Sequence, residues 1–473
     1  MTERDAVFLP VRELAEKVRT RQVSPVALTR LFLDRLERIG PRYNAVVTLT
    51  ADLAEKQAQE AAREIAAGRY RGPLHGVPYG LKDVFATEGY PTTWGAGPLR
   101  DQAFAYDATI VCRLREAGAV LAAKLALVEL AGGTGYRRAD ASFTGPGLSP
   151  WNPDTWSGGS SSGSGSAVAA GLVPFAIGTE TWGSIVGPST NCAVCGLRPT
   201  FGRVSRHGGM PLTYGMDKPG PMCLTADDCG LVLNAVAGHD ERDEATATRP
   251  YEYRPHRPEG GRFRLGVPRG VPDGSQPGVR DRFREALDTL AEVADVEVVE
   301  LPDLPYAEVS SAIFLAESAS VMEELIDSGI TAGLTAPEAR IGIYPRTAML
   351  ATDYLRALRL RRTIAVAADR LLARYDALLS PTRPTVAPPA DRPWVKKSGE
   401  RAADPLGAFG SCVGLPAISV PMGFADDGLP IGLQILGRAY DENVVLAVAS
   451  AYQELTDWHA RHPQDLLQGI ATD

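Results

Sequence analysis

Residues 157–166 read Ser-Gly-Gly-Ser-Ser-Ser-Gly-Ser-Gly-Ser, ten consecutive positions that hold only glycine and serine. Such a run is compatible with a flexible linker, a cradle for phosphate groups, or a catalytic site lined by backbone and hydroxyl groups. The alanine-rich stretch at 167–173 that follows is typical of a buried helix, and Trp151 and Trp156 lie just before the run. These flanks argue against a linker. Because no Lys-Ser or Lys-Thr follows the glycines, a nucleotide loop is disfavoured as well.

The overall composition describes an ordinary globular protein and narrows the classes of function. The 473 residues are 44% apolar and 22% charged, and 49 Lys and Arg against 57 Asp and Glu give a formal net charge of −8. These values exclude a disordered or fibrous chain. The mild acidic excess disfavours a protein that mainly grips phosphate backbones. Nineteen of the 48 glycines lie between Gly132 and Gly220, so the glycine excess has a local cause.

The sequence lacks the usual signals for membrane insertion, secretion or metal binding. It has no uninterrupted apolar run of about 18 residues, and residues 1–10 lack the apolar core of a secretory signal. The six cysteines suggest no disulfide framework, which favours a cytoplasmic protein with reduced thiols. Cys192 and Cys195 form a C-x-x-C pair, but no second pair supplies further zinc ligands. We therefore expect both to be packing residues, and we expect no metal site and no cofactor.

Helical and strand patterns alternate along the chain. Ser24-Pro25, followed by apolar residues at helical spacing and then Gly40, predicts a capped helix. Residues 264–269 and 296–301 are typical of strands that flank a helix at 279–293, which makes one βαβ unit. Other predicted segments are strands at 45–49, 119–123, 417–421 and 431–436, helices at 51–68, 306–328, 346–374 and 441–456, and a loop at 381–405. No internal repeat is present, so the alternation indicates one α/β fold.

Several motifs, in matching order and spacing, resemble the amidase signature family. The glycine-serine run supplies Ser157-Gly158-Gly159-Ser160-Ser161, and Gly178-Thr179-Glu180-Thr181-Trp182-Gly183-Ser184-Ile185 resembles the family's nucleophile segment. The other matching motifs are Cys195-Gly196-Leu197-Arg198-Pro199-Thr200, His75-Gly76-Val77-Pro78 followed by Lys82-Asp83, Gly414-Leu415-Pro416-Ala417, and Gly428-Leu429-Pro430-Ile431-Gly432-Leu433-Gln434. The likeness spans roughly residues 8–455.

This resemblance implies a single amidase domain over residues 1–473. The implied architecture is an α/β fold whose central mixed, twisted sheet is covered by helices on both faces. A signature core is expected at about 70–225, and a C-terminal part at about 260–460 is expected to complete the sheet and the substrate pocket.

The resemblance also implies a Ser–Ser–Lys triad for amide hydrolysis. Ser184 matches the nucleophile that forms the acyl-enzyme, and Lys82 matches the general base. Ser160 matches the bridging serine, which in this family follows a cis peptide bond, and Ser161 is expected to hold the lysine. A serine hydroxyl needs a base within hydrogen-bond reach, and a lysine with a pKa near 10.4 is neutral in only about one molecule in 2,500 at pH 7. Lys82 is therefore expected to be buried and bonded to Ser160, while Asp83 points elsewhere.

The family's oxyanion hole corresponds to backbone N–H groups of the nucleophile segment. The resemblance assigns this role to Thr181, Trp182, Gly183 and Ser184. Glycine at such a place lets the backbone approach a substrate carbonyl. The residues expected to contact the substrate are Gly132, Gly133, Tyr136 and Trp182, with Phe314, Tyr344 and Trp394 as further aromatic candidates.

Two positions depart from the family pattern. Trp182 stands where the family usually has glycine, so an indole must fit beside the site. Val186 stands where the family usually has an arginine that pairs with the acid matching Glu180. In some members the arginine of that region also binds a substrate carboxylate, so Val186 weakens the case for a free-acid substrate. Candidate partners for Glu180, by sequence proximity, are Arg198, Arg203 and Arg206.

The favoured function is an amidase that hydrolyses the C–N bond of a neutral carboxamide. The expected partner is that small-molecule amide, and neither a nucleic acid nor a membrane is expected to bind. A homodimer is an open alternative to a monomer. An amide- or ester-forming acyltransferase remains open, because an amine can capture the acyl-enzyme in a dry site. A second alternative resembles the A subunit of tRNA-dependent amidotransferases, which releases ammonia from glutamine, although Val186 disfavours it. A degenerate binding scaffold is disfavoured by the intact Lys82, Ser160 and Ser184.

Overall fold

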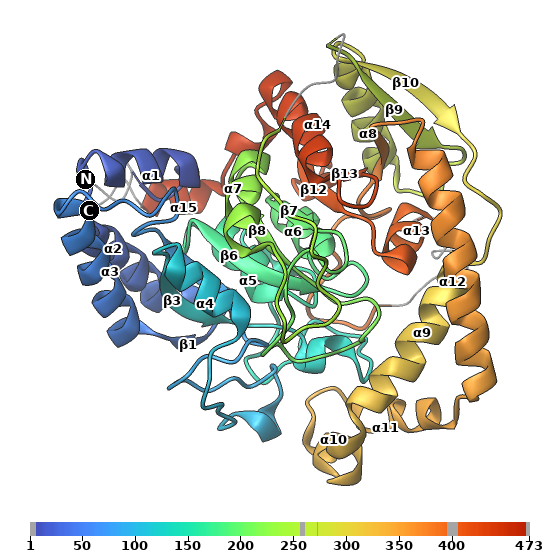
Figure 1. The fold of residues 1–473 in the computed structure, drawn as a ribbon, viewed down its shortest axis with the longest axis horizontal. Coiled ribbons are helices and arrows are strands. Elements are labelled where there is room, and N and C mark those ends of the chain that lie inside the picture. The colour runs from blue at the N-terminus through green and yellow to red at the C-terminus, as the bar shows by residue number, and fades with distance from the viewer. Residues whose placement is uncertain (1–5, 256–260, 272, 395–404, 470–473) are drawn as a thin grey trace.

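One large mixed sheet organises the chain (Figure 1). The computed structural model describes residues 6–255, 261–271, 273–394 and 405–469, and within them eleven strands form a single sheet. Their spatial order is β1 (Val46–Leu49), β3 (Val120–Leu125), β2 (Pro78–Lys82), β6 (Phe175–Glu180), β8 (Lys218–Cys223), β7 (Cys195–Arg198), β12 (Ala417–Phe424), β13 (Pro430–Leu436), β11 (Ala377–Pro381), β9 (Phe263–Pro268) and β10 (Ala294–Val299). The pairs β2/β3, β2/β6, β9/β10 and β9/β11 are parallel, and the other neighbouring pairs are antiparallel.

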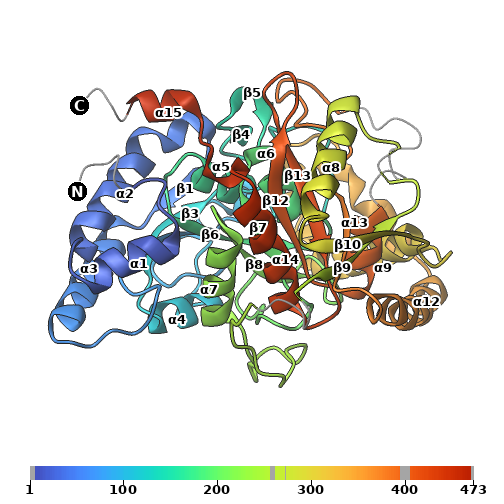
Figure 2. The same ribbon diagram turned by 90° about the horizontal axis from the view of Figure 1, so that it is seen from above.

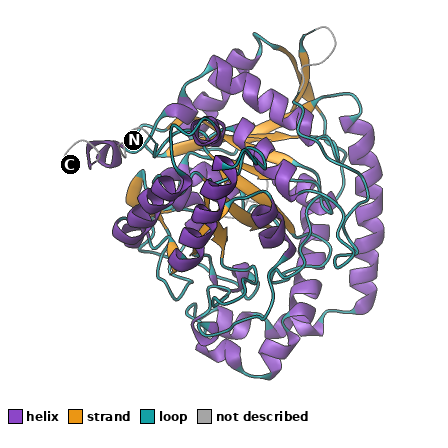
Figure 3. Cartoon of the chain, turned by 60° about the vertical axis from the view of Figure 1, so that its left-hand side comes forward, coloured by secondary structure: helices purple, strands orange, loops and turns teal. Residues whose placement is uncertain are grey.

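Helices cover both faces of this sheet (Figures 2 and 3). They are α1 (Val11–Arg19), α2 (Pro25–Arg38), α3 (Ala51–Ala66), α4 (Thr109–Glu116), α5 (Ser162–Ala169), α6 (Val186–Cys192), α7 (Ala226–Val236), α8 (Pro277–Leu290), α9 (Tyr306–Val321), α10 (Glu323–Asp327), α11 (Ala339–Gly342), α12 (Ala351–Leu372), α13 (Pro405–Val413), α14 (Glu442–Leu455) and α15 (Gln464–Gly469). Because successive residues of a strand point to opposite faces, the side chains of β6 contact the helices on both faces of the sheet. Phe175 and Ile177 belong to an apolar cluster with α4, α7 and α14, whereas Ala176 packs with α2, α5 and α6. The predicted α/β architecture is confirmed.

Several helices and strands form where local sequence signals predict them. The Ser24 hydroxyl accepts the N–H of Val26 at 3.2 Å, and Pro25 begins α2 as the cap signal predicts. Strands β9 and β10 pair in parallel around α8, which is the predicted βαβ unit. The helical pattern at 306–328 divides into α9 and α10 at Met322. Of the predicted loop, residues 382–394 contain no helix or strand, and 395–404 lie outside the described residues.

The helix expected after the glycine-serine run begins earlier than predicted. Helix α5 begins at Ser162, inside the run, and all of its residues are buried. The hydroxyls find backbone acceptors, since Ser164 donates to the Ile177 carbonyl at 3.1 Å and Ser166 donates to the Leu148 carbonyl at 2.7 Å. Satisfied hydroxyls allow a serine-rich helix to lie in the protein interior. The run is therefore part of the core and not a linker.

Candidate functional site

Lys82 lies at the carboxyl end of β2, next to the parallel strand β6. Its side chain is fully buried, and Nζ donates to Ser160 Oγ and to Thr179 Oγ1, each at 2.8 Å. Burial lowers the pKa of Lys82 to about 7, although the nearby charges of Asp217 and Glu180 oppose this change. At neutral pH the amine is uncharged in about half of the molecules and is able to accept a proton.

The neighbouring carboxylate of Asp83 turns away from Lys82. Lys124 Nζ lies 2.7 Å from the Asp83 carboxylate, and both side chains are fully buried. The Thr93 N–H donates to the same carboxylate at 2.9 Å. Asp83 therefore pairs with Lys124, and the amine of Lys82 contacts hydroxyl groups and no carboxylate of the described residues. This is the arrangement expected for a lysine that must be neutral to act as a base.

Ser160 reaches Lys82 from the turn that precedes α5, and Ser161 follows it in that turn. The peptide bond between Gly159 and Ser160 is cis. The Ser161 hydroxyl donates to the Thr179 carbonyl at 3.2 Å and accepts the Thr179 N–H at 3.3 Å. Ser161 thus holds Thr179, and Thr179 in turn contacts the lysine. Sequence reasoning did not single out Thr179, although it stands within the motif quoted around Ser184.

Ser184 lies against this cluster through its backbone. The Ser161 N–H donates to the Ser184 carbonyl at 3.2 Å. Gly183 has a φ of +83°, in the left-handed region that favours glycine. Among the described residues no acceptor takes the backbone N–H groups of 181–184. The turn before α6 therefore carries four backbone donors that have no acceptor among the described residues.

The carboxylate of Glu180 holds the start of the helix that follows Ser184. It accepts the N–H groups of Ile185 at 2.8 Å and Val186 at 3.0 Å, and it pairs with Arg198 at 2.7 Å, where both side chains are fully buried. Burial alone would raise the pKa of Glu180, but the charges of Arg198 and Lys218 outweigh it and lower the pKa to about 2. Arg198 therefore pairs with Glu180 in place of the arginine that the family usually has at the position of Val186. The other candidates pair elsewhere, Arg203 with Glu442 and Arg206 with Asp243.

Of the expected substrate-contacting residues, Gly132, Tyr136 and Trp394 lie together. A Cβ atom at Gly132 would come within 2.5 Å of the Tyr136 ring, and one at Gly133 would meet Leu212 and Met322. Tyr136 contacts Trp156 and Trp394 edge to face, with ring centroids 6.0 and 5.7 Å apart, and the two tryptophans stack at 4.0 Å. The three remaining candidates are a half-buried Trp182, a Phe314 ring covered by Arg346, and a Tyr344 that is 45% exposed.

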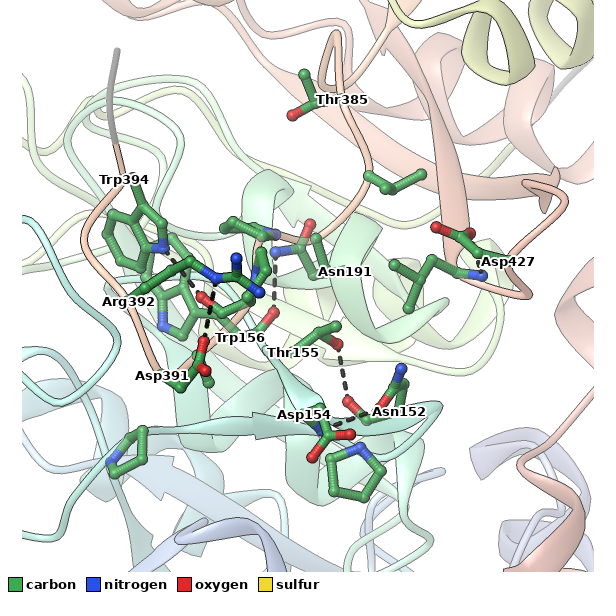
Figure 4. A pocket seen from close by; sticks show the side chains of 18 of the residues that line it. Asn152, Asp154, Thr155, Trp156, Asn191, Thr385, Asp391, Arg392, Trp394 and Asp427 are labelled. Carbon is green, nitrogen blue, oxygen red and sulfur yellow. Dashed lines mark hydrogen bonds and ion pairs between the residues drawn. The ribbon is translucent and has the colours of Figure 1, made fainter.

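A cavity of about 1120 Å³ opens beside these tryptophans (Figure 4). Trp394, Asp391 and Arg392 lie on one side of it, and Thr385 and Asp427 lie on the other. Most of the remaining lining comes from residues 383–393 and from β5 (Asn152–Trp156), which forms a small hairpin with β4 (Leu148–Ser149). Asn191, near the end of α6, also lines it. The cavity thus borders the helix that follows Ser184.

The described residues hold no group of three or more His, Cys, Asp or Glu side chains arranged to bind a metal ion. Cys192 and Cys195 are buried and unpaired. Among the helices that the structure describes, none combines the length and the apolar character needed to cross a bilayer.

Comparisons with known proteins identify the family. The Amidase family model matches residues 27–446. The A subunit of the glutamyl-tRNA(Gln) amidotransferase of Moorella thermoacetica is 38% identical, with 97% of this chain and 98% of that protein covered. The solved peptide amidase from Stenotrophomonas maltophilia is 34% identical with a TM-score of 0.82, with 96% of this chain and 98% of that chain covered. A bacterial aryl acylamidase of the amidase signature family is 26% identical with a TM-score of 0.84, with 98% and 99% covered. The chain therefore belongs to the amidase family of enzymes.

Proposed function

We propose that this enzyme hydrolyses a carboxamide through an acyl-enzyme on Ser184. The observation that carries the proposal is the fully buried Lys82, whose Nζ lies 2.8 Å from Ser160 Oγ and whose pKa burial lowers to about 7. A buried amine with hydroxyl partners is suited to act as a general base at neutral pH. By resemblance to the amidase signature family, Lys82 matches the general base and Ser160 matches the bridging serine.

The proposed reaction begins with two proton transfers. Neutral Lys82 takes the proton of Ser160 as Ser160 takes that of Ser184, and the Ser184 oxygen forms a bond to the substrate carbonyl carbon. The proton then returns through Ser160 to the substrate nitrogen, the C–N bond breaks, and ammonia or an amine leaves. Water attacks the resulting ester and gives a proton to Lys82 by the same path. Return of that proton to Ser184 releases the acid and restores the enzyme.

Backbone donors are proposed to stabilise the negative oxygen formed in each half-reaction. Glu180 engages the N–H groups of Ile185 and Val186, which holds the turn, while the N–H groups of 181–184 meet no described acceptor. Removing one such donor in known enzymes costs about 3–4 kcal/mol of transition-state stabilisation. Trp182 contributes only its peptide N–H to this role, so its indole is compatible with it.

Trapping the acyl-enzyme tests the proposal. The protein is incubated with a panel of amides and esters, quenched in acid and digested, and the acylated peptide is located by mass spectrometry. The expected label is on Ser184, and Ser184→Ala should abolish turnover. Ser164→Ala is the matched control, because this buried serine of the same run donates to the Ile177 carbonyl and should keep turnover. A label on another residue, or turnover by Ser184→Ala, would contradict the mechanism.

A second candidate is an amidotransferase A-type subunit that works with partner proteins. The 38% identity to the Moorella thermoacetica protein favours it. Ammonia release from glutamine is measured for the chain alone and with the partner subunits and glutamyl-tRNA of a related amidotransferase. Activity that requires those additions would support this candidate, and hydrolysis of simple amides by the chain alone would support the first.

An acyl-transferring variant of the same chemistry is separated by product analysis. Turnover in the presence of an added amine should still release only the free acid if water is the acceptor. We further propose that residues 1–473 act as one amidase domain in the cytoplasm, which the unpaired cysteines support.

A further inference from the structure

The guanidinium of Arg383 lies on the nucleophile segment although it comes from a distant part of the chain. Arg383 follows β11 and lines the cavity of Figure 4. A Cβ atom at Gly187 would lie 2.4 Å from Arg383 Nη2 and 3.1 Å from Cζ and Nε, and one at Gly183 would lie 3.6 Å from Nη2. The guanidinium therefore packs against Gly187, and a side chain at that position would displace it.

Arg383 is half-buried and makes no hydrogen bond or ion pair with any residue that the structure describes. Other arginines in this region have partners. Arg392, on the wall of the same cavity, pairs with Asp391 at 3.2 Å, and Arg346 donates to the Gly133 carbonyl and to Ser318 Oγ. A half-buried guanidinium that lines a cavity and has no described partner keeps its N–H donors available for an anion that enters the cavity.

We propose that Arg383 binds a carboxylate carried by the substrate, so that the preferred substrates are amides of short dicarboxylic acids with one free acid group. The inference rests on the proposed amide hydrolysis. A Cβ atom at Gly183 would lie 3.6 Å from Arg383 Nη2, so the guanidinium lies beside the residue that directly precedes the proposed nucleophile Ser184. An arginine fork binds a carboxylate through two parallel N–H···O bonds, which also orients the ligand.

The position of Arg383 favours a free-acid substrate, which the sequence disfavoured because of Val186. Val186 removes the arginine of the usual position and weakens the case for a free-acid substrate on sequence grounds. Arg383 places a positive charge beside the same turn from another strand of the sheet. The stacked Trp156 and Trp394 supply an apolar wall of the same cavity for the methylene groups between the acid and the amide.

Binding to an inactive variant tests the proposal without turnover. Calorimetry on Ser184→Ala compares succinamate and glutaramate with their neutral isosteres 4-oxopentanamide and 5-oxohexanamide, in which a methyl ketone replaces the carboxylate. The acids should bind more tightly than the ketones. Adding Arg383→Met should lower the acid-to-ketone affinity ratio by about 10- to 150-fold, the range expected for hydrogen bonds to a charged group. Arg383→Lys should keep part of the preference, because it keeps the charge but not the fork.

Arg392→Met is the matched control, because it removes an exposed arginine of the same cavity that already has a carboxylate partner. Its acid-to-ketone ratio should stay within about twofold of the parent, since exposed charges contribute little. Gly187→Ala should lower the ratio while keeping the charge, because the new methyl group displaces the guanidinium.

Equal affinity for acids and ketones, no binding of the acids, or a ratio that Arg383→Met leaves unchanged would overturn the inference. The kcat/KM ratio of the active enzyme on the same four amides separates this result from the proposed function. If the acids bind through Arg383 and no ammonia is released, hydrolysis is wrong and the binding site stands. If the ketone amides are hydrolysed as fast as the acids, the amidase proposal stands and the carboxylate site is wrong.

Discussion

Replacing Lys82 with methionine should abolish turnover and at the same time stabilise the protein at neutral pH. Methionine keeps the unbranched shape of the side chain and carries no proton. A lysine in an unfolded chain has a pKa near 10.4, and burial lowers the pKa of Lys82 to about 7 in the fold. Between these values the unfolded chain holds a proton that the folded protein lacks. The lysine therefore destabilises the fold most at and below about pH 7, and this cost shrinks as the pH rises.

The size of the effect follows from proton linkage. The change in pKa destabilises the fold by about 4 kcal/mol at pH 7 and by about 2 kcal/mol at pH 9. Lys82→Met loses the hydrogen bonds to Ser160 and Thr179, each worth about 1 kcal/mol. It should still exceed the wild type in free energy of unfolding at pH 7, and its advantage should fall by about 2 kcal/mol by pH 9.

Unfolding in guanidinium chloride at pH 7, 8 and 9, followed by circular dichroism, measures this difference. Lys218→Met is the control, because Lys218 is also buried with a pKa lowered to about 7 by burial, but its Nζ donates to the Thr181 carbonyl at 3.2 Å and not to Ser160. It should show the same pH dependence of stability with a smaller loss of turnover. A difference between Lys82→Met and the wild type that is constant from pH 7 to 9 would refute the lowered pKa. Turnover retained by Lys82→Met would refute its role as base.

Three other measurements probe neighbouring parts of the site. Arg198→Met leaves the fully buried Glu180 without its partner at 2.7 Å and should cost about 3–5 kcal/mol in denaturant unfolding; the double variant with Glu180→Gln should recover most of that loss. Gly183→Ala forces a side chain onto a backbone with a φ of +83° and should cost about 1–2 kcal/mol while lowering kcat, and unchanged stability would argue against the strain. The wild-type kcat/KM should rise with pH through a midpoint near 7, because Lys82 must be neutral to accept a proton, and a flat profile from pH 6 to 9 would contradict this.

The features that could be predicted from sequence are those encoded within a few residues of one another. The cap at Ser24 and the βαβ unit of β9, α8 and β10 depend on local periodicity and on turn residues, and both are present. The burial of Lys82 could be expected because its proposed chemistry needs a neutral amine. The start of α5 was missed because a Gly/Ser run has weak helix propensity, and the hydroxyl acceptors that support it come from other segments.

Contacts between distant segments could not be predicted in this way. Proximity along the chain left three arginines as partners for Glu180, and the order β6, β8, β7 in the sheet is what selects Arg198. The contact of Arg383 with Gly187 joins the end of β11 to α6, which packs on β13, the neighbour of β11 in the sheet. These segments are far apart in the sequence, so no local pattern indicates the contact. Thr179 alternates with its neighbours on β6, but which face meets Lys82 depends on the pairing of β6 with β2.

The neutral form of Lys82 depends as much on where the nearby carboxylates are held as on burial. Asp83 is paired with Lys124 at 2.7 Å, and Glu180 is paired with Arg198. Asp217 accepts the N–H groups of Leu212 at 2.7 Å and Thr213 at 2.8 Å. Glu180 and Asp217 still raise the pKa of Lys82, but at a distance, so burial prevails and the pKa is about 7. A carboxylate that turned from its own partner to Lys82 would hold the amine charged, and the pair would be a structural ion pair in place of a base. The separate cation or backbone partner of each carboxylate is therefore a condition for the proposed chemistry.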